Sequence, residues 1–436
     1  MNNLDKFQLF HLQSLNLAYF VYYFMKYISP YKTDDPTPIF NKLKDKSGVI
    51  IFGTGNCGTI VLETLLNKKI NVLALSDNNM HRWGNKINEI EIIPPKEISN
   101  KFKDVPVLIA VDLNFPFIRK QLNELKISEI YDCDFIFSSL EIDLENCKNV
   151  TWSETRFKQK IDLYMYSVLA HKNRKTTLKV DSIDLMLTEK CSLKCKDCSN
   201  LMQLYAKPID QDFEMVISSI DTFLNSVDHC REIRLLGGEP LMYKKVYQVV
   251  EHVLKYKNFD QLKINTNGTI IPKENKINVF QDKRVFFDIS NYGKISRNVN
   301  GLVKVLEEKK ISHNAARVTE WQDVGKIIKS NRSDQLNKEI FGNCCINRGL
   351  TLLHGKLYLC PFSANATNLK AIKYVDEEII DIKLYNKTEL KDKIQKLYFE
   401  TDFLEACKSC NGRDHNVKRV EAALQAAEPL KYEIVS

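Results

Sequence analysis

The chain has 436 residues, of which 44% are hydrophobic and 27% charged, a balance typical of folded globular domains and not of disordered chains. Its formal net charge of +8 comes from lysines that are scattered along the sequence, so we expect no nucleic-acid partner. Twelve cysteines without a recognisable secretory signal favour a reducing cytoplasm and metal binding over disulfide bonds. The length predicts two or three domains.

Residues 1–45 are predicted to form N-terminal helices. Within them, residues 15–28 are rich in Leu, Tyr and Phe, but Asn16 and Lys26 interrupt the apolar run and no basic region precedes it. The segment therefore reads as neither a signal peptide nor a membrane span, and we expect no stable membrane insertion. Docking on a neighbouring domain or subunit fits this pattern, and so does contact with a membrane surface.

Residues 46–145 alternate between strand and helix patterns and predict a Rossmann-like α/β domain. A buried-strand pattern runs into G-x-G-x-x-G at Gly53, Gly55 and Gly58, and an apolar helical stretch follows. The next strand ends at Asp77, about where a dinucleotide fold places its ribose-binding acid. The order of elements resembles the N-terminal domain of bacterial sugar acyltransferases, in which the glycine turn can face a nucleotide-sugar. Nucleotide binding and a purely structural turn both fit the motif.

Residues 146–180 are expected to be a linker that contains one helix. A short apolar run after it predicts a buried strand, which opens into C-x3-C-x2-C at Cys191, Cys195 and Cys198. Three thiolates on one loop can hold three irons of a [4Fe–4S] cube and leave the fourth iron open to a ligand. Disulfide pairing fits an odd number of crowded cysteines badly, and zinc usually requires a fourth protein ligand.

Residues 181–330 repeat the order strand then helix, which predicts a partial parallel (β/α)6 barrel with ligands at the carboxyl ends of its strands. At one of these ends the sequence reads G-G-E-P. Two glycines let backbone approach a ligand closely, and a carboxylate at a strand end can face an ammonium group. The residues of this turn are Gly237, Gly238, Glu239 and Pro240.

Residues 331–436 carry a second cysteine set and predict a small α+β domain. Two of its cysteines flank a predicted β-hairpin and two more form C-x2-C. Four such cysteines can close a complete [4Fe–4S] site, and zinc is the alternative. Either member of the pair Cys344–Cys345 can supply the first ligand, and we prefer Cys345. The predicted ligands are Cys345, Cys360, Cys407 and Cys410.

The spacing C-x3-C-x2-C, followed about 40 residues later by G-G-E-P, resembles the radical S-adenosylmethionine (radical SAM) superfamily. In that family SAM chelates the open iron, and the G-G-E-P turn lies beside the SAM amino group. The resemblance also implies that Ser290 and Asn291, at the end of a later strand, lie near the SAM ribose and carboxylate. One departure is Asp197, which stands where the family usually has an aromatic residue near the adenine.

The C-terminal cysteines resemble the SPASM extension of radical SAM enzymes, or its shorter form, Twitch. Asn416 and Val420 stand where the longer form has two more cysteines, so this region has ligands for one auxiliary cluster. The cofactors implied are two [4Fe–4S] clusters and SAM, with an external electron donor.

The resemblances imply an oxidoreductase or epimerase. It would cleave SAM reductively and abstract hydrogen from a small molecule, a carbohydrate or nucleotide-sugar. Modification of a ribosomal peptide is the rival enzymatic interpretation, and a non-catalytic SAM-binding iron–sulfur protein is the other alternative.

Overall fold

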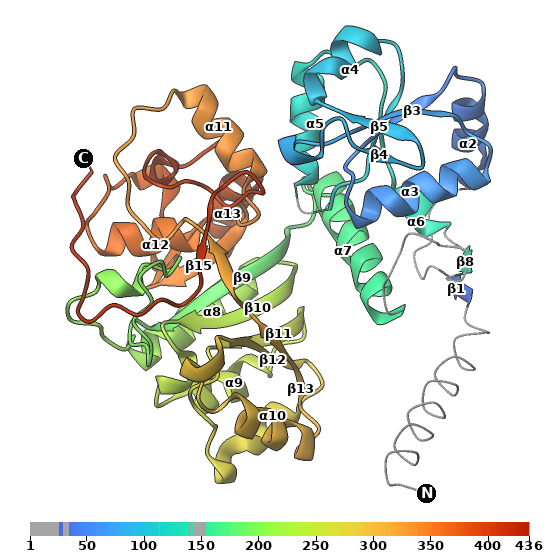
Figure 1. Cartoon of the computed structure of the whole chain (residues 1–436). Coiled ribbons are helices and arrows are strands. Elements are labelled where there is room, and N and C mark those ends of the chain that lie inside the picture. Colours follow the sequence, from blue (N-terminus) through green and yellow to red (C-terminus); the bar gives the residue numbers. More distant parts are fainter. Residues whose placement is uncertain (1–25, 29–34, 113, 140, 144–153, 436) are drawn as a thin grey trace, which may run out of the picture. The chain divides into compact units, whose positions relative to one another are not determined.

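The computed structural model describes residues 26–28, 35–112, 114–139, 141–143 and 154–435 (Figure 1). The chain divides into two compact units, Met1–Leu169 and Ala170–Ser436. The predicted N-terminal helices lie largely outside the described residues; the described part of that segment holds strand β1 (Lys26–Ile28) and helix α2 (Thr37–Lys44). No helix within the described ranges combines the length and the apolar character that a membrane crossing requires.

The first unit is built on a six-stranded sheet with the order β4-β5-β3-β2-β6-β7. Neighbouring strands are parallel except for the pair β4–β5. The strands are β2 (Val49–Phe52), β3 (Val72–Ser76), β4 (Lys86–Ile87), β5 (Ile90–Ile93), β6 (Val107–Ile109) and β7 (Ile130–Asp132), and β8 (Glu141–Asp143) pairs with β1. The helices are α3 (Asn56–Asn67), α4 (Pro95–Lys101), α5 (Phe115–Glu124), α6 (Asp134–Ser138) and the short η1 (Met80–Arg82). The central strands are continuous apolar runs because both of their faces are covered.

Helix α7 (Glu154–Lys172) differs from the linker expected at residues 146–180. Its buried apolar side chains belong to the core of the first unit. Tyr164, on this helix, donates a hydrogen bond to the carbonyl oxygen of Ile109 at 2.6 Å and accepts one from the backbone N–H of Cys133 at 2.9 Å. These contacts join the helix to β6 and to the start of α6, so this part of the chain folds with the α/β domain.

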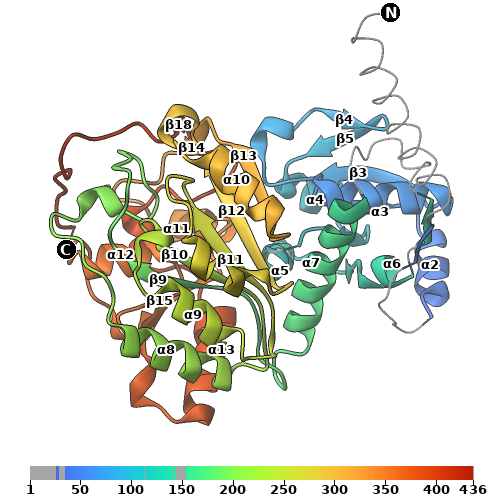
Figure 2. The same ribbon diagram turned by 90° about the horizontal axis from the view of Figure 1, so that it is seen from below.

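The second unit contains an eight-stranded sheet with the order β13-β12-β11-β10-β9-β15-β16-β17. Its strands are β9 (Lys179–Thr188), β10 (His229–Gly237), β11 (Phe259–Thr266), β12 (Val285–Asn291), β13 (Ser312–Arg317), β15 (Gly349–Leu353), β16 (Lys356–Tyr358) and β17 (Ile380–Asp381). The helices are α8 (Phe213–Ser226), α9 (Val246–Val253), α10 (Val299–Glu308), α11 (Asp334–Asn343), α12 (Pro361–Asn368) and α13 (Lys387–Glu400). Figure 2 shows β9 to β12 beside one another.

The strand count in the predicted barrel region differs from the expected six. Five parallel strands, β9 to β13, come from that region. The sixth parallel strand is β15, which pairs with the other edge of β9 and comes from the C-terminal cysteine-rich segment. The short β14 (Glu320–Gln322) instead pairs with β18 (Arg419–Glu421) in a separate two-stranded sheet. The edge of β9 needs a hydrogen-bonding partner, and β15 provides it, so the two predicted C-terminal domains share one sheet.

The two faces of the large sheet differ in character because successive side chains of a strand point to opposite faces. In β9, the alternate residues Ile183, Leu185 and Leu187 belong to the core shared with residues of α8 and α9. The residues between them lie on the opposite face, which carries polar side chains on the neighbouring strands. All parallel strands end at the same edge of the sheet, and the first cysteine set follows the end of β9.

Candidate metal centres

The first cysteine loop, residues 189–199, follows β9 and carries the C-x3-C-x2-C motif. Leu193 and Cys195 are buried together with Ala423 of the C-terminal segment, and the side chains of Tyr292 and Trp321 pack against this group. The loop also pairs with the C-terminal segment through a β-bridge between Cys195 and Gln425. The structure therefore brings the three predicted cysteines together in a sheltered, partly apolar site, Cys191, Cys195 and Cys198.

The sulfur atoms of this loop accept hydrogen bonds from nitrogen donors. Sγ of Cys191 accepts from the backbone N–H of Leu193 at 3.4 Å and from the side-chain amide of Asn267 at 3.6 Å. Sγ of Cys195 accepts from the side-chain amide of Gln425 at 3.3 Å. Donors of this kind stabilise thiolates and tune the potential of an iron–sulfur cluster, so the donor set suits a thiolate-ligated cluster.

Burial raises the pKa of the thiols in this loop, that of Cys195 to about 11, and desolvation is also the largest cause for Cys191 and Cys198. Such thiols stay protonated in the absence of a cation, and a metal centre must displace the protons to obtain thiolate ligands. The loop thus fits a cluster that binds by deprotonating its ligands.

The G-G-E-P turn packs directly on the first cysteine loop. Gly237 has φ +135°, and a Cβ at this position would lie 2.1 Å from the carbonyl oxygen of Thr188. A Cβ on Gly238 would lie 2.2 Å from the carbonyl oxygen of Lys190 and 2.7 Å from Cβ of Cys191. The two glycines are therefore required by the close approach of the turn to the loop itself.

The side chain of Glu239 is buried and bonded to the end of the neighbouring strand β11. It is 0% exposed, and its carboxylate accepts hydrogen bonds from the backbone N–H groups of Leu241 and Asn267 and from the hydroxyl of Thr266. Burial raises its pKa to about 7. The oxygens of this carboxylate bind the end of β11, and its contact with a ligand ammonium stays a prediction. The main chain of the turn, with Pro240 at the start of η4 (Pro240–Met242), is likewise a candidate for SAM.

The end of β12 lies beside the same loop. Oδ1 of Asn291 accepts from the backbone N–H of Gly293 at 2.9 Å, and the carbonyl oxygen of Ser290 accepts from the hydroxyl of Ser296 at 3.3 Å. Both side chains are part-buried, and their predicted contact with SAM stays a prediction. The next residue, Tyr292, packs against the first cysteine loop and was not predicted from the sequence. The signal available in the sequence was its position directly after the Ser-Asn pair at the end of a strand.

Asp197 is held by a specific partner. Its carboxylate forms an ion pair with Nζ of Lys326 at 3.1 Å. The backbone of Asp197 also touches Gly325, where a Cβ would lie 2.3 Å from the carbonyl carbon of Asp197. The residue that replaces the usual aromatic thus fastens the first cysteine loop to the segment after β14.

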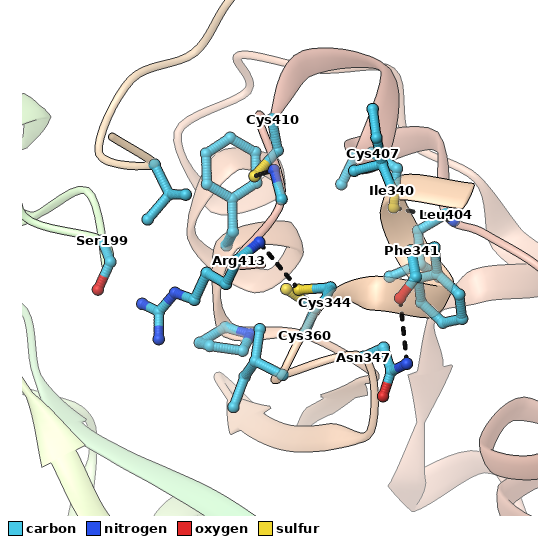
Figure 3. A pocket seen from close by; sticks show the side chains of 16 residues that line it. Ser199, Ile340, Phe341, Cys344, Asn347, Cys360, Leu404, Cys407, Cys410 and Arg413 are labelled. Atoms are coloured by element: carbon cyan, nitrogen blue, oxygen red, sulfur yellow. Dashed lines mark hydrogen bonds between the residues drawn. The ribbon is translucent and has the colours of Figure 1, made fainter. Parts of the chain in front are cut away.

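The second cysteine set lines one cavity, called here the auxiliary cavity (Figure 3). The cysteines that line it are Cys344, Cys360, Cys407 and Cys410. Cys345 is not among them and is exposed. The structure therefore corrects one predicted ligand: Cys344, at the end of α11, replaces Cys345. Adjacent residues point in different directions, and packing of α11 turns the first of the pair toward the other three.

The thiols of the auxiliary cavity also receive backbone donors. Cys344 accepts from the N–H of Arg413 at 3.4 Å, Cys407 from that of Leu404 at 3.4 Å, and Cys410 from that of Gly412 at 3.3 Å. Two of these bonds are drawn in Figure 3. Burial raises the pKa of Cys344 to about 12 and that of Cys360 and of Cys410 to about 11.

The donor chemistry of the auxiliary cavity suits a [4Fe–4S] cluster, because four thiols and main-chain N–H groups line a cavity that is otherwise largely apolar. Within the described part of the chain, no three or more His, Cys, Asp or Glu side chains are grouped so that they could hold a single metal ion.

In the G-x-G-x-x-G turn of the first unit, Thr54 is hydrogen-bonded to Asp77 and Arg82 of the same unit. Asp77 accepts hydrogen bonds from the backbone N–H and the hydroxyl of Thr54, and Arg82 donates to the carbonyl oxygen of Thr54 at 2.7 Å. A Cβ on Gly58 would lie 1.8 Å from the carbonyl oxygen of Gly53, whereas Gly55 has no neighbouring atom within 4 Å of such a Cβ. Gly58 is required for helix–strand packing, and Gly55 is the open position of the motif.

Two family models match this chain. Residues 45–130 match the model described as C2185-like, N-terminal, and residues 184–292 match that of a 4Fe-4S single cluster domain. Among curated proteins, GTP 3',8-cyclase of Clostridium acetobutylicum is 23% identical over 137 residues, which cover 28% of this chain and 42% of the cyclase. The chain thus spans less than half the length of this relative.

Two solved structures resemble the chain weakly. The structure of native anSMEcpe with bound AdoMet and Cp18Cys peptide is 14% identical, with a TM-score of 0.36, and the match covers 57% of this chain and 92% of that one. The structure of BtrN in complex with AdoMet and 2-DOIA is 16% identical, with a TM-score of 0.35 and coverage of 53% and 93%.

Several features of the second unit occur together. The first cysteine loop carries C-x3-C-x2-C at the end of a parallel strand, and the G-G-E-P turn of the adjacent strand packs on it. The auxiliary cavity gathers four cysteines from the C-terminal segment, and the region of the loop matches a 4Fe-4S single cluster domain. Together these features are similar to those of the radical SAM superfamily with a SPASM-like C-terminal domain.

Proposed function

We propose that this protein is a radical SAM oxidoreductase or epimerase that removes a hydrogen atom from a carbohydrate or nucleotide-sugar. The observation that carries the proposal is the presence of two separate cysteine sets, one of three and one of four, in one folded unit. When bound, the cluster on the first loop and SAM supply the radical chemistry, with an electron from an external donor.

The first loop and the residues that pack on it would have three tasks in this proposal. The three cysteines of the loop would hold three irons and leave the fourth to SAM. Packing of Leu193, Tyr292 and Trp321 around the cysteines excludes water from the site. Gly237 and Gly238 keep the turn of β10 against the loop, so that the main chain of the turn lies beside the ligand of the open iron.

A polar row on the sheet supports a polyhydroxylated substrate. In the parallel register, Asn265 on β11 pairs with Asp288 on β12, and Asp288 pairs with Asn314 on β13. All three lie on the face opposite the helix-covered core; Asn265 is one residue from the carboxyl end of β11, and Asp288 and Asn314 lie near the middle of their strands. Within the described residues, the buried Oδ1 of Asn265 has no hydrogen-bond partner. Amide and carboxylate groups in a row can donate to and accept from sugar hydroxyls, so this row favours a carbohydrate.

The first unit is proposed to recognise the nucleotide part of such a substrate. Gly55 lies at the N-terminus of α3, where N–H groups and the helix dipole favour phosphate, and it is the one glycine of the motif with open space around it. Because Asp77 already binds Thr54, a ribose hydroxyl would share that carboxylate or displace Thr54. Gly55→Val in the full chain is expected to abolish nucleotide-sugar binding measured by calorimetry and to leave SAM cleavage without substrate unchanged.

The central test is reductive cleavage of SAM. Anaerobically reconstituted protein with dithionite is expected to produce 5′-deoxyadenosine, and the variant with Cys191, Cys195 and Cys198 all changed to Ala is expected to produce none. Deuterium transfer into 5′-deoxyadenosine from labelled nucleotide-sugars, free sugars or peptides then identifies the substrate class. Undiminished SAM cleavage by the triple variant would refute the assignment, and deuterium transfer from peptides alone would refute the carbohydrate.

The polar row has its own test. Asp288→Asn and Asn265→Ala are expected to lower deuterium transfer from the carbohydrate about tenfold or more, because a site built to bind hydroxyls loses affinity when one partner is removed. Cleavage of SAM in the absence of substrate is expected to stay at the level of the unchanged protein. Equal loss of both activities would show instead that the row supports the fold.

A further inference from the structure

Arg413 lies between the two cysteine sites of the second unit. Its side chain lines the auxiliary cavity together with Ser199, the residue after Cys198 of the first loop. Figure 3 shows its guanidinium directed toward Ser199, away from the helix that carries Cys344. The backbone N–H of Arg413 donates to Sγ of Cys344, so the residue is anchored to one site by its main chain and reaches toward the other with its side chain.

The charge of Arg413 acts on cysteines of both sites. Burial raises the pKa of Cys198, Cys360 and Cys410, and the positive charge of Arg413 opposes that rise at each of them. Among the described residues, its guanidinium forms no hydrogen bond and no ion pair with a carboxylate. The charge of Arg413 also acts on the buried carboxylate of Asp184, but that carboxylate is paired with Arg234 at 2.5 Å.

The negative charge expected of a cluster at each site would face the positive charge of Arg413. A [4Fe–4S] core of charge about +2 with four thiolates carries a net charge of about −2, and with three thiolates about −1. Reduction by one electron from an external donor takes the core to about +1 and makes either site more negative by one charge. A fixed cation nearby therefore stabilises the reduced form of each cluster more than the oxidised form, and it does so strongly where the surroundings are dry.

We propose that Arg413 is the shared counter-cation of the two cysteine sites and raises the reduction potential of both clusters. This inference rests on the proposed presence of two clusters. The effect is larger at the auxiliary site, because Arg413 lines that cavity and donates its backbone N–H to Sγ of Cys344, whereas it approaches the first loop at Ser199, the residue after Cys198. Arg413 thus acts through its positive charge on the clusters, and this role does not require contact with substrate.

The test is a potentiometric titration of the reconstituted full chain, followed by electron paramagnetic resonance. In Arg413→Gln, at a solution potential near the auxiliary midpoint, the ratio of reduced to oxidised auxiliary cluster is expected to fall about tenfold, equal to about 59 mV for a one-electron couple. The first cluster is expected to shift in the same direction by less. Arg413→Lys keeps the charge and is expected to stay close to the unchanged protein. Arg419→Gln removes the same charge from an exposed position on β18 and is expected to shift neither cluster.

Iron analysis separates the ways in which the inference can fail. About four irons per unchanged chain would refute the second cluster, and the shared role with it. About eight irons in Arg413→Gln with unchanged potentials would refute the role of Arg413 alone. Loss of auxiliary iron from Arg413→Gln but not from Arg413→Lys would support the need for a cation, whereas loss from both would mean that the shape of the guanidinium matters and not its charge.

Discussion

The side-chain amide of Gln425 donates a hydrogen bond to Sγ of Cys195 at 3.3 Å, although 230 positions separate the two residues. The same side chain accepts a bond from the backbone N–H of Lys194 at 2.8 Å. Backbone bonds on either side, from Lys196 to Leu424 and from Ala426 to Lys194, align the C-terminal segment with the first cysteine loop. The segment around Gln425 is therefore part of the first candidate metal centre.

This relationship predicts the behaviour of Gln425→Leu. The change removes the N–H···S bond to Cys195, and loss of such a donor shifts the potential of a cluster to more negative values. The first cluster is expected to become harder to reduce while the auxiliary cluster keeps its potential, as measured by redox titration. Gln335→Leu, at an exposed glutamine of α11, serves as the control, and an equal shift in both variants would contradict the prediction.

Gly238→Ala and Gly55→Ala form a matched pair. A Cβ on Gly238 meets Lys190 and Cys191 at 2.2 and 2.7 Å, whereas Gly55 has open space and a φ of −77°. Overpacking costs about 1–3 kcal/mol, so Gly238→Ala is expected to lower the free energy of unfolding of the second unit by that amount and to reduce iron bound at the first loop. Gly55→Ala is expected to change neither; denaturant unfolding and iron analysis measure both effects, and full iron retention by Gly238→Ala would count against the close packing.

Cys344→Ala and Cys345→Ala distinguish the two adjacent candidates for the fourth auxiliary ligand. Cys344 lines the auxiliary cavity and Cys345 is exposed. Cys344→Ala is expected to lose the auxiliary cluster, so that iron falls from about eight to about four per chain, and Cys345→Ala is expected to keep the full amount. The reverse pattern would restore the ligand preferred from the sequence, and zinc in place of the second four irons would identify a structural zinc site.

The raised pKa of Glu239 predicts that the free energy of unfolding depends on pH. Its folded-state pKa is raised by burial from 4.5 to about 7, so between these values the folded chain keeps a proton that the unfolded chain has released. The contribution of this group to stability is therefore fully present below about pH 4.5 and is lost as the pH rises through about 7, a loss of about 3 kcal/mol. In Glu239→Gln this pH-dependent contribution to the free energy of unfolding is absent.

The measurement for Glu239 is the difference in unfolding free energy between the unchanged protein and Glu239→Gln, without metal, at pH 5 and pH 8. The difference is expected to move in favour of the variant as the pH rises. Because Thr266 and Asn267 donate to the carboxylate, Gln also changes the hydrogen bonds, but that change does not depend on pH. A difference that stays constant across this range would contradict the raised pKa.

Local spacing in the sequence was enough to predict several features. Cys191, Cys195 and Cys198 lie within eight residues on one loop, so their convergence needs no long-range contact. The glycines of both turns follow strands, and an added Cβ would meet backbone atoms at Gly53, Gly58, Gly237 and Gly238, whereas Gly55 has open space. The alternation of strands and helices predicted an α/β protein because each parallel connection requires a crossover.

Other features were decided only by the tertiary structure, because they depend on residues that are distant in sequence. Strand β15 joins β9 because that edge is available for pairing, which moves the sixth parallel strand into the cysteine-rich segment. The choice of Cys344 over its neighbour depends on how α11 packs, and the carboxylate of Glu239 turns to the end of β11 because the donors there satisfy a buried charge. The positions of Gln425 and Arg413 follow no sequence motif: the hydrogen bond of Gln425 to Cys195 and the charge of Arg413 lie beside cysteines only because folding places them there.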